Sequence, residues 1–254
     1  MMKSKITLIG NGNMAFAIAS GLVSTYDVEV VGRDMSKLDD FEARLKTDIK
    51  KTLYKDFNAE DKSLILCVKP ANITAMKSMI KGKGKALYSV LAGTAIEILK
   101  ANIDAKNYVR SMPNLAANIK KSMTTLTGDE ACKEEAINIF SSIGYTLWVA
   151  SEKELNIATA LAGSGPAYLA LVAESLADGA VKQGLKRDDA MTLMRGLFAG
   201  FGDIIQDVHP AVFKDAVMSP GGTTAAGYSA LEENGVRNGC IKAIEAAYKR
   251  ATEL

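Results

Sequence analysis

Histidine and cysteine are scarce in this chain. The one histidine, His209, precedes Pro210 between two helical segments, and we interpret it as a surface or helix-cap residue. This placement argues against a histidine-based triad and a histidine general acid, and one histidine cannot form a histidine-rich metal site. The three cysteines, Cys67, Cys132 and Cys240, are widely spaced, so we expect neither a disulfide framework nor a metal site. This usage is typical of a reducing cytoplasm.

The chain also lacks a strong excess of charge of one sign, because it has 31 basic and 29 acidic residues. The basic residues form no block longer than pairs such as Lys50-Lys51 and Lys120-Lys121, which argues against a nucleic-acid partner. The run from Met1 to Ile9 does not have the pattern of a signal peptide, so a cytoplasmic location is expected.

One long stretch, Leu155 to Ala173, has no charged residue. Its length approaches that of a membrane span, but Asn156, Thr159 and the breaker Gly163-Ser164-Gly165-Pro166 interrupt it. We therefore favour a helix buried against a partner subunit over a transmembrane helix.

The start of the chain has the pattern of a dinucleotide-binding unit. Lys5 to Ile9 is an apolar strand, Gly10-Asn11-Gly12-Asn13-Met14-Ala15 follows directly, and a helix and a second strand at Val28 to Val31 come next. In a G-x-G-x-x-A turn the first glycine makes the bend and the second lets the backbone approach a pyrophosphate, while the alanine keeps helix and strand close. The alternative is a merely tight turn.

The second strand ends at Gly32-Arg33-Asp34. An acid at this point would bind a ribose hydroxyl, whereas an arginine accommodates a 2′-phosphate. Arg33 comes first and Lys37 lies one helical turn beyond, so NADPH is favoured, with NADH possible and a plain surface pair as the alternative.

Apolar strands alternate with helices through the first 150 residues, and we predict strands over 5–9, 28–31, 63–68, 86–90, 107–110 and 145–149. This alternation predicts a mostly parallel, doubly wound sheet of the Rossmann type. Ligands of such sheets lie outside the carboxyl ends of the strands. Three loops fall there, namely Val68-Lys69-Pro70, Ala92-Gly93 and Met112-Pro113-Asn114.

Strand signals stop at Ser151, and the remainder predicts helices over 152–184, 188–207, 210–218, 223–234 and 235–254. We therefore predict a dinucleotide-binding domain over 1–150 and an all-α domain for dimerisation and substrate binding over 151–254. The helices are too apolar to stand alone, which predicts an obligate homodimer through the second domain.

The turn Ser219-Pro220-Gly221-Gly222-Thr223-Thr224 precedes one of these helices. Free backbone N–H groups and the positive end of a helix attract a small anion. The alternative is an ordinary loop with a capped helix.

Together, these motifs resemble pyrroline-5-carboxylate reductase. The resemblance rests on Ile9 to Ala15, Val68 to Pro70, Arg110 to Asn114, Thr159 to Tyr168 and Val217 to Thr224. It implies reduction of 1-pyrroline-5-carboxylate to L-proline by NAD(P)H, and a Rossmann domain followed by a helical dimerisation domain. It also implies dimers that gather into larger rings, such as a decamer. The chain departs from the family pattern at Leu115-Ala116, Asn156, Ala162, Ala216 and its last residues.

The resemblance further implies two sets of ligand-binding residues. The cofactor set is Ile9, Gly10, Asn11, Gly12, Asn13, Met14, Arg33, Asn58, Cys67, Val68, Lys69, Pro70, Leu91, Ala92 and Gly93. The substrate set is Glu152, Ser219, Gly222, Thr223 and Thr224.

A cyclic imine nitrogen is basic enough to take its proton from water or a modest donor. We expect the Thr224 hydroxyl to hydrogen-bond the ring nitrogen and to act as the catalytic group. The substrate carboxylate would lie on the N–H groups of Gly222 and Thr223, with help from Ser219. Thr224 as a helix cap only is the alternative.

Two other functions stay open. A β-hydroxyacid dehydrogenase would need a lysine near Tyr168 to Leu171, where the chain has none. A non-catalytic NADPH sensor would need no second, anion-binding turn. The sequence leaves undetermined the range of imino acids and any feedback by proline.

Overall fold

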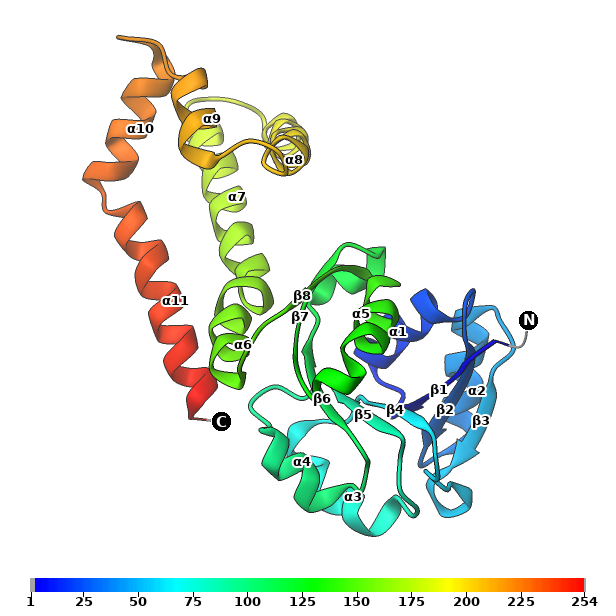
Figure 1. Ribbon diagram of the computed structural model, residues 1–254. Coiled ribbons are helices and arrows are strands. Elements are labelled where there is room, and N and C mark those ends of the chain that lie inside the picture. Colours follow the sequence, from blue (N-terminus) through cyan, green and yellow to red (C-terminus); the bar gives the residue numbers. More distant parts are fainter. Residues whose placement is uncertain (1–2, 254) are drawn as a thin grey trace. The chain divides into compact units, whose positions relative to one another are not determined.

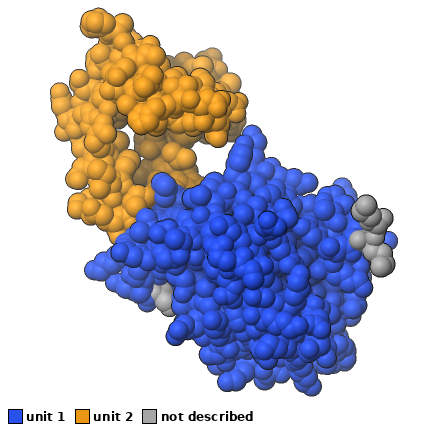
Figure 2. Space-filling model, viewed as in Figure 1, with its two compact units in different colours: residues 1–164, 247–254 blue, residues 165–246 orange. Residues whose placement is uncertain are grey.

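A computed structural model describes residues 3–253 and divides the chain into two compact units (Figures 1 and 2). Unit 1 comprises residues 1–164 and 247–254, and unit 2 comprises residues 165–246. The fold class predicted from the sequence is confirmed, because an α/β domain built on a sheet is followed by helices.

Unit 1 contains one eight-stranded sheet in the order β3-β2-β1-β4-β5-β6-β7-β8. Its strands are β1 (Lys5–Ile9), β2 (Asp27–Gly32), β3 (Lys50–Leu53), β4 (Ser63–Leu66), β5 (Ala86–Ser89), β6 (Tyr108–Met112), β7 (Ser122–Gly128) and β8 (Gly144–Trp148). All neighbours are parallel except β6 and β7. The carboxyl ends of β1, β2, β4, β5 and β6 therefore share one edge.

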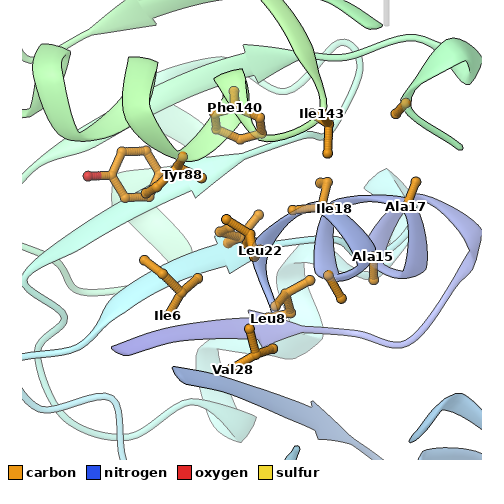
Figure 3. Packing of buried hydrophobic residues seen from close by; sticks show 14 of the residues in the cluster. Ile6, Leu8, Ala15, Ala17, Ile18, Leu22, Val28, Tyr88, Phe140 and Ile143 are labelled. Carbon is orange, nitrogen blue, oxygen red and sulfur yellow. The ribbon is translucent and has the colours of Figure 1, made fainter. Parts of the chain in front are cut away.

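Helices cover both faces of this sheet. One face carries α1 (Asn13–Leu22), α2 (Met35–Leu45) and α5 (Lys133–Ser141), and the other carries α3 (Ile73–Met79) and α4 (Ile96–Asn102). On the first face, Ile18 and Leu22 pack with Leu8, Phe140 and Ile143 (Figure 3). All five side chains are fully buried, so this packing fixes α1 and the turn before it against the sheet.

Unit 1 continues beyond β8 into α6 (Glu152–Ala158) and a π-helical turn, η5 (Thr159–Gly163). Its i to i+5 bond runs from the N–H of Ser164 to the carbonyl of Thr159 over 3.0 Å. Such turns occur often at functional sites.

Unit 2 is helical. It contains α7 (Gly165–Lys182), α8 (Arg187–Ile204), α9 (Pro210–Val217), α10 (Thr223–Glu233) and most of α11 (Val236–Thr252). These bounds lie within a few residues of the predicted ones. His209 is the N-cap of α9, and its Nδ1 accepts a hydrogen bond from the N–H of Ala211, which confirms its prediction as a cap residue.

The uncharged stretch lies in α6, η5 and α7. The continuous run 152–182 is long and apolar enough to cross a membrane by length and composition, and 11% of its most apolar window is buried. Leu169 and Leu171 are 57% and 64% exposed. An apolar helix left this open needs a covering partner.

Candidate functional site

The glycine-rich turn after β1 lies beside a cavity of about 450 Å³ at the carboxyl edge of the sheet. Its walls come from the ends of three neighbouring strands, β1, β2 and β4, and from α3. The lining residues are Gly10, Asn11, Gly12, Gly32, Arg33, Tyr54, Cys67, Val68, Lys69, Asn72, Ala75, Met76 and Met79.

The two glycines of this turn have different roles. Gly10 has φ +109°, and a Cβ there would lie 2.9 Å from the carbonyl oxygen of Cys67, so only glycine fits. Gly12 is the N-cap of α1, has no side-chain cap, and a Cβ there would meet nothing within 4 Å. Gly12 therefore leaves open space in front of the first N–H groups of a helix, which fits a dinucleotide pyrophosphate.

The side chains after β2 divide between structure and cavity. Asp34 is the N-cap of α2, and its Oδ1 accepts from the N–H of Ser36 over 2.9 Å. Arg33 lines the first cavity and a neighbouring one of about 540 Å³, to which Lys55 and Lys81 also contribute. The Asp34 carboxylate thus caps helix α2, whereas the three basic side chains of Arg33, Lys55 and Lys81 line the neighbouring cavity.

The lining of this cavity includes one thiol, Cys67, and one phenol, Tyr54. Burial raises the pKa of the Cys67 thiol, so the thiol is protonated at neutral pH. Burial likewise raises the pKa of Tyr54, an effect that the positive charge of Arg33 opposes. Burial thus favours the neutral form of both groups.

A further cavity of about 320 Å³ lies in unit 1 at the ends of β5 and β6. Ala92 and Gly93 line it from the loop after β5. The rest of its wall consists of Arg110, Met112, Asn156, Thr159, Ala160, Ser164, Ala247, Arg250 and Ala251. The three last residues belong to the carboxyl end of α11, whose contribution the sequence did not predict.

Not every predicted cofactor residue lines a cavity. Ile9 and Leu91 are buried in the core, and Met14 packs against it. Asn13 begins α1 and Pro70 begins η2 (Pro70–Asn72), beside the first cavity. Asn58 is exposed and pairs with Lys81 in an isolated β-bridge, and its Oδ1 accepts from the N–H of Glu60 over 2.9 Å.

Glu152, predicted to bind substrate, is engaged in a network within unit 1. Its Oε1 accepts from Nη1 of Arg110 over 2.9 Å and from the N–H of Ile96 over 3.0 Å. Nη2 of Arg110 donates to Oδ1 of Asn156 over 3.3 Å. Arg110 is buried, and its Nε has no hydrogen-bond partner among the described residues.

The predicted anion-binding turn lies in unit 2 between α9 and α10. Gly221 has φ +71°, the N–H of Gly222 donates to the carbonyl of Ser219 over 3.0 Å, and Gly222 is the N-cap of α10. No side chain within residues 3–253 caps this helix end. Since the N-cap is Gly222, the alternative that made Thr224 the cap is wrong, and the first N–H groups of α10 are free for a ligand.

Comparison with known proteins identifies the family. The chain is 32% identical to pyrroline-5-carboxylate reductase of Helicobacter pylori strain J99, covering 96% of this chain and 98% of the relative. It is 35% identical to the reductase of that name from Synechocystis, over 100% and 99% of the two chains.

The chain belongs to the pyrroline-5-carboxylate reductase family. Residues 152–254 match the family model for pyrroline-5-carboxylate reductase dimerisation, and residues 5–93 match that for NADP oxidoreductase, coenzyme F420-dependent.

Solved structures of this reductase family agree with the fold. That of the Coxiella burnetii reductase has TM-score 0.87 and 30% identity over 99% of this chain and 98% of the other. That of the Plasmodium falciparum reductase with NADP bound has TM-score 0.80 and 26% identity over 99% of both chains.

Proposed function

We propose that this chain reduces 1-pyrroline-5-carboxylate to L-proline with a reduced nicotinamide dinucleotide, as the final step of proline biosynthesis in the cytoplasm. The observation that carries the proposal is identity of 30% or more to reductases of this name over nearly the whole chain. Steady-state oxidation of NADPH, followed by its absorbance with 1-pyrroline-5-carboxylate as substrate, tests it.

The bound nicotinamide would supply the hydride. The glycine-rich turn holds the pyrophosphate at the N-terminus of α1, and Val68 and Lys69 line the cavity beside it. Gly93 and Ala92 line the next space along the same edge. The protein thus positions the nicotinamide against the substrate, and this positioning supplies much of the rate of a hydride transfer.

Reduction of a cyclic imine requires few catalytic groups from the protein. The N–H groups of Gly222 and Thr223, with the Ser219 hydroxyl, bind the carboxylate at the positive end of α10. Of these two N–H groups, that of Gly222 also donates to the carbonyl of Ser219 over 3.0 Å. The Thr224 hydroxyl forms a hydrogen bond with the ring nitrogen and orients the neighbouring carbon for hydride attack. The imine nitrogen takes its proton from water or this donor.

Replacement of Thr224 by alanine tests the last assignment. We expect Thr224→Ala to lower kcat/KM by about 10- to 1000-fold, the scale of losing one oriented donor. The matched control is Thr192→Ala, also in unit 2, because that hydroxyl donates only to the carbonyl of Asp188 within its own helix. An unchanged kcat/KM for Thr224→Ala would contradict the role.

NADPH is the proposed cofactor, with NADH as the weaker one. Arg33 lines both cavities, Lys55 and Lys81 line the second, and Asp34 is occupied as a helix cap. Arg33→Ala should therefore lower kcat/KM with NADPH more than with NADH. Arg44→Ala is the control, since that guanidinium lies 4.1 Å from the centroid of the Phe16 ring. Equal losses with both cofactors would favour a general role.

The same assay separates the proposal from two rivals. A β-hydroxyacid dehydrogenase would oxidise hydroxyacids, and an NADPH sensor would bind the cofactor without consuming it. We further propose a dinucleotide-binding domain over 1–150, an all-α domain over 151–254 that forms a homodimer, and assembly of dimers into a ring.

A further inference from the structure

We propose that Glu152 and Arg110 form a positioning pair for hydride transfer. Their role is to hold the loop 91–95, and neither is assigned a contact with the substrate. The inference rests on the proposed function, since it concerns the step in which the imine is reduced. It changes the assignment of Glu152, which the family resemblance places among the substrate-binding residues.

The position of Glu152 supports an indirect role. Arg110 and Asn156 line the cavity at the ends of β5 and β6, whereas Glu152 is absent from the described lining. One carboxylate oxygen of Glu152 accepts from both the Arg110 guanidinium and the N–H of Ile96. The carboxylate therefore connects strand β6 to the start of α4.

The loop 91–95 is fastened at both ends by these contacts. At its near end, the N–H of Leu91 donates to Oγ of Ser89 over 3.3 Å, and Oγ of Ser111 donates to the carbonyl of Ser89 over 3.0 Å. At its far end, Ala95 caps α4 without a side-chain bond, and Glu152 supplies the acceptor for Ile96. Between these ends, Gly93 at φ +66° bends the loop into the cavity wall.

The charge of the pair makes the contact strong. The side chain of Arg110 is 3% exposed and that of Glu152 is 35% exposed, so the guanidinium depends on this carboxylate for compensation. An arginine presents its donors in a fixed, planar fork, which lets Arg110 engage Glu152 and Asn156 at once. A lysine cannot reproduce that geometry.

Hydride transfer is sensitive to such positioning, because a displacement of about 1 Å can reduce a rate about 100-fold. If Glu152 acts through the loop, its loss should lower kcat and leave substrate affinity unchanged. If Glu152 binds the substrate, its loss should raise KM and the inhibition constant of the product, L-proline.

The experiment compares Glu152→Gln, Arg110→Lys and their double variant with Glu154→Gln. Glu154 is the matched control, because it lies in the same helix and its carboxylate accepts from the N–H of Ala150, outside the network. The readouts are kcat, KM for 1-pyrroline-5-carboxylate, inhibition by L-proline, and the primary isotope effect with NADPH deuterated at the transferred position.

We expect kcat of Glu152→Gln to fall by about 10- to 100-fold with a larger isotope effect, while KM and proline inhibition stay those of the parent. The double variant should lose no more than the more impaired single variant, since both remove one interaction. A raised KM with unchanged kcat, or behaviour equal to that of Glu154→Gln, would overturn the inference. If the parent chain does not turn over 1-pyrroline-5-carboxylate at all, the proposed function fails instead.

Discussion

Gly10 and Gly12 differ in what a side chain would meet, although both belong to one turn. A Cβ at Gly10 collides with the backbone of Cys67, while one at Gly12 enters open space on the cavity wall. The first glycine is therefore required by the fold, whereas the fold leaves room for a side chain at the second, and only the proposed ligand would require glycine there. The sequence motif predicts both glycines, but only the surrounding atoms separate these two requirements.

This difference predicts separable effects. Gly12→Val should keep the thermal midpoint of the parent and weaken cofactor binding, because φ −80° and ψ −175° suit any residue and the added methyl groups occupy the cavity. Gly10→Ala should lower the thermal midpoint. Differential scanning calorimetry and NADPH titration by fluorescence measure the two properties. Unaltered NADPH affinity in Gly12→Val would contradict the assigned site.

Glu29 is a buried carboxylate in the middle of β2 that the sequence analysis did not single out. Burial alone raises its pKa, but hydrogen bonds from Lys62, Thr52 and Lys50 outweigh burial and lower the pKa to about 2. Its oxygens lie 2.7 Å from Nζ of Lys62 and 2.7 Å from Oγ1 of Thr52. Glu29 thus joins β2 to its neighbours.

A lowered pKa links Glu29 to acid stability. The ionised form stabilises the fold above pH 4.5, the ordinary value, and this contribution is lost as the pH falls toward 2. The shift corresponds to about 3 kcal/mol. Glu29→Gln should therefore lower the free energy of unfolding at pH 7 and flatten its dependence between pH 4.5 and 2. Urea unfolding at several pH values measures this, and parallel curves for both proteins would refute it.

At the scale of elements, the apolar strands and the helices of the second half were predictable, because their hydrophobic periodicity is strong. Strand β7 was missed, since its buried positions Ser122, Thr124, Thr125 and Thr127 are polar. Strand β3 was missed as well, because it begins with two lysines and pairs only with β2. Threonine-rich strands carry a β-propensity signal that polarity conceals.

The π-helical turn η5 could not be predicted either, because its stabilising contact comes from a residue far away in the chain. Nδ2 of Asn114 donates to the carbonyl of Ala162 over 3.0 Å, and its Oδ1 accepts from the N–H of Ala116. Asn114 therefore holds η5 against the segment that follows β6, and Thr159, Ala160 and Ser164 form part of the cavity wall there.

Loss of this contact should affect stability and rate together. Asn114→Ala should lower the free energy of unfolding by about 1 kcal/mol or somewhat more, because a carbonyl loses its partner, and it should reduce kcat. Asn118→Ala is the control, since its Nδ2 donates only to the carbonyl of Leu115 in the same short helix. Equal behaviour of the two variants in urea unfolding and steady-state kinetics would argue against the role of η5.

At the scale of the whole molecule, unit 2 exposes much apolar surface. On α8, Leu193 and Leu197 are 64% and 58% exposed, and their spacing of four residues places them on one face. The match of residues 152–254 to a dimerisation domain gives this surface a role. The apolar composition predicted an interface in this part of the chain, and the sequence analysis assigned the stretch Leu155 to Ala173 to it, whereas α8 was not singled out.

Charges on this face should prevent association. Leu193→Glu with Leu197→Glu should convert the dimer to a monomer in sedimentation at micromolar concentration, because two carboxylates would have to be buried. Ile98→Glu, an exposed apolar position of α4 in unit 1, should leave the dimer intact. A dimeric double variant would exclude the α8 face, and a monomeric parent would contradict the dimer itself.

The path of the chain between the two units limits how the molecule can be divided. Residues 247–252 of α11 belong to unit 1, so unit 2 is an insertion between two segments of unit 1. The cavity at the ends of β5 and β6 is completed by Ala247, Arg250 and Ala251, and its other lining residues precede residue 165 in the chain. A fragment that stops at residue 164 would lack that wall, and a bulky tag fused close behind α11 would crowd it.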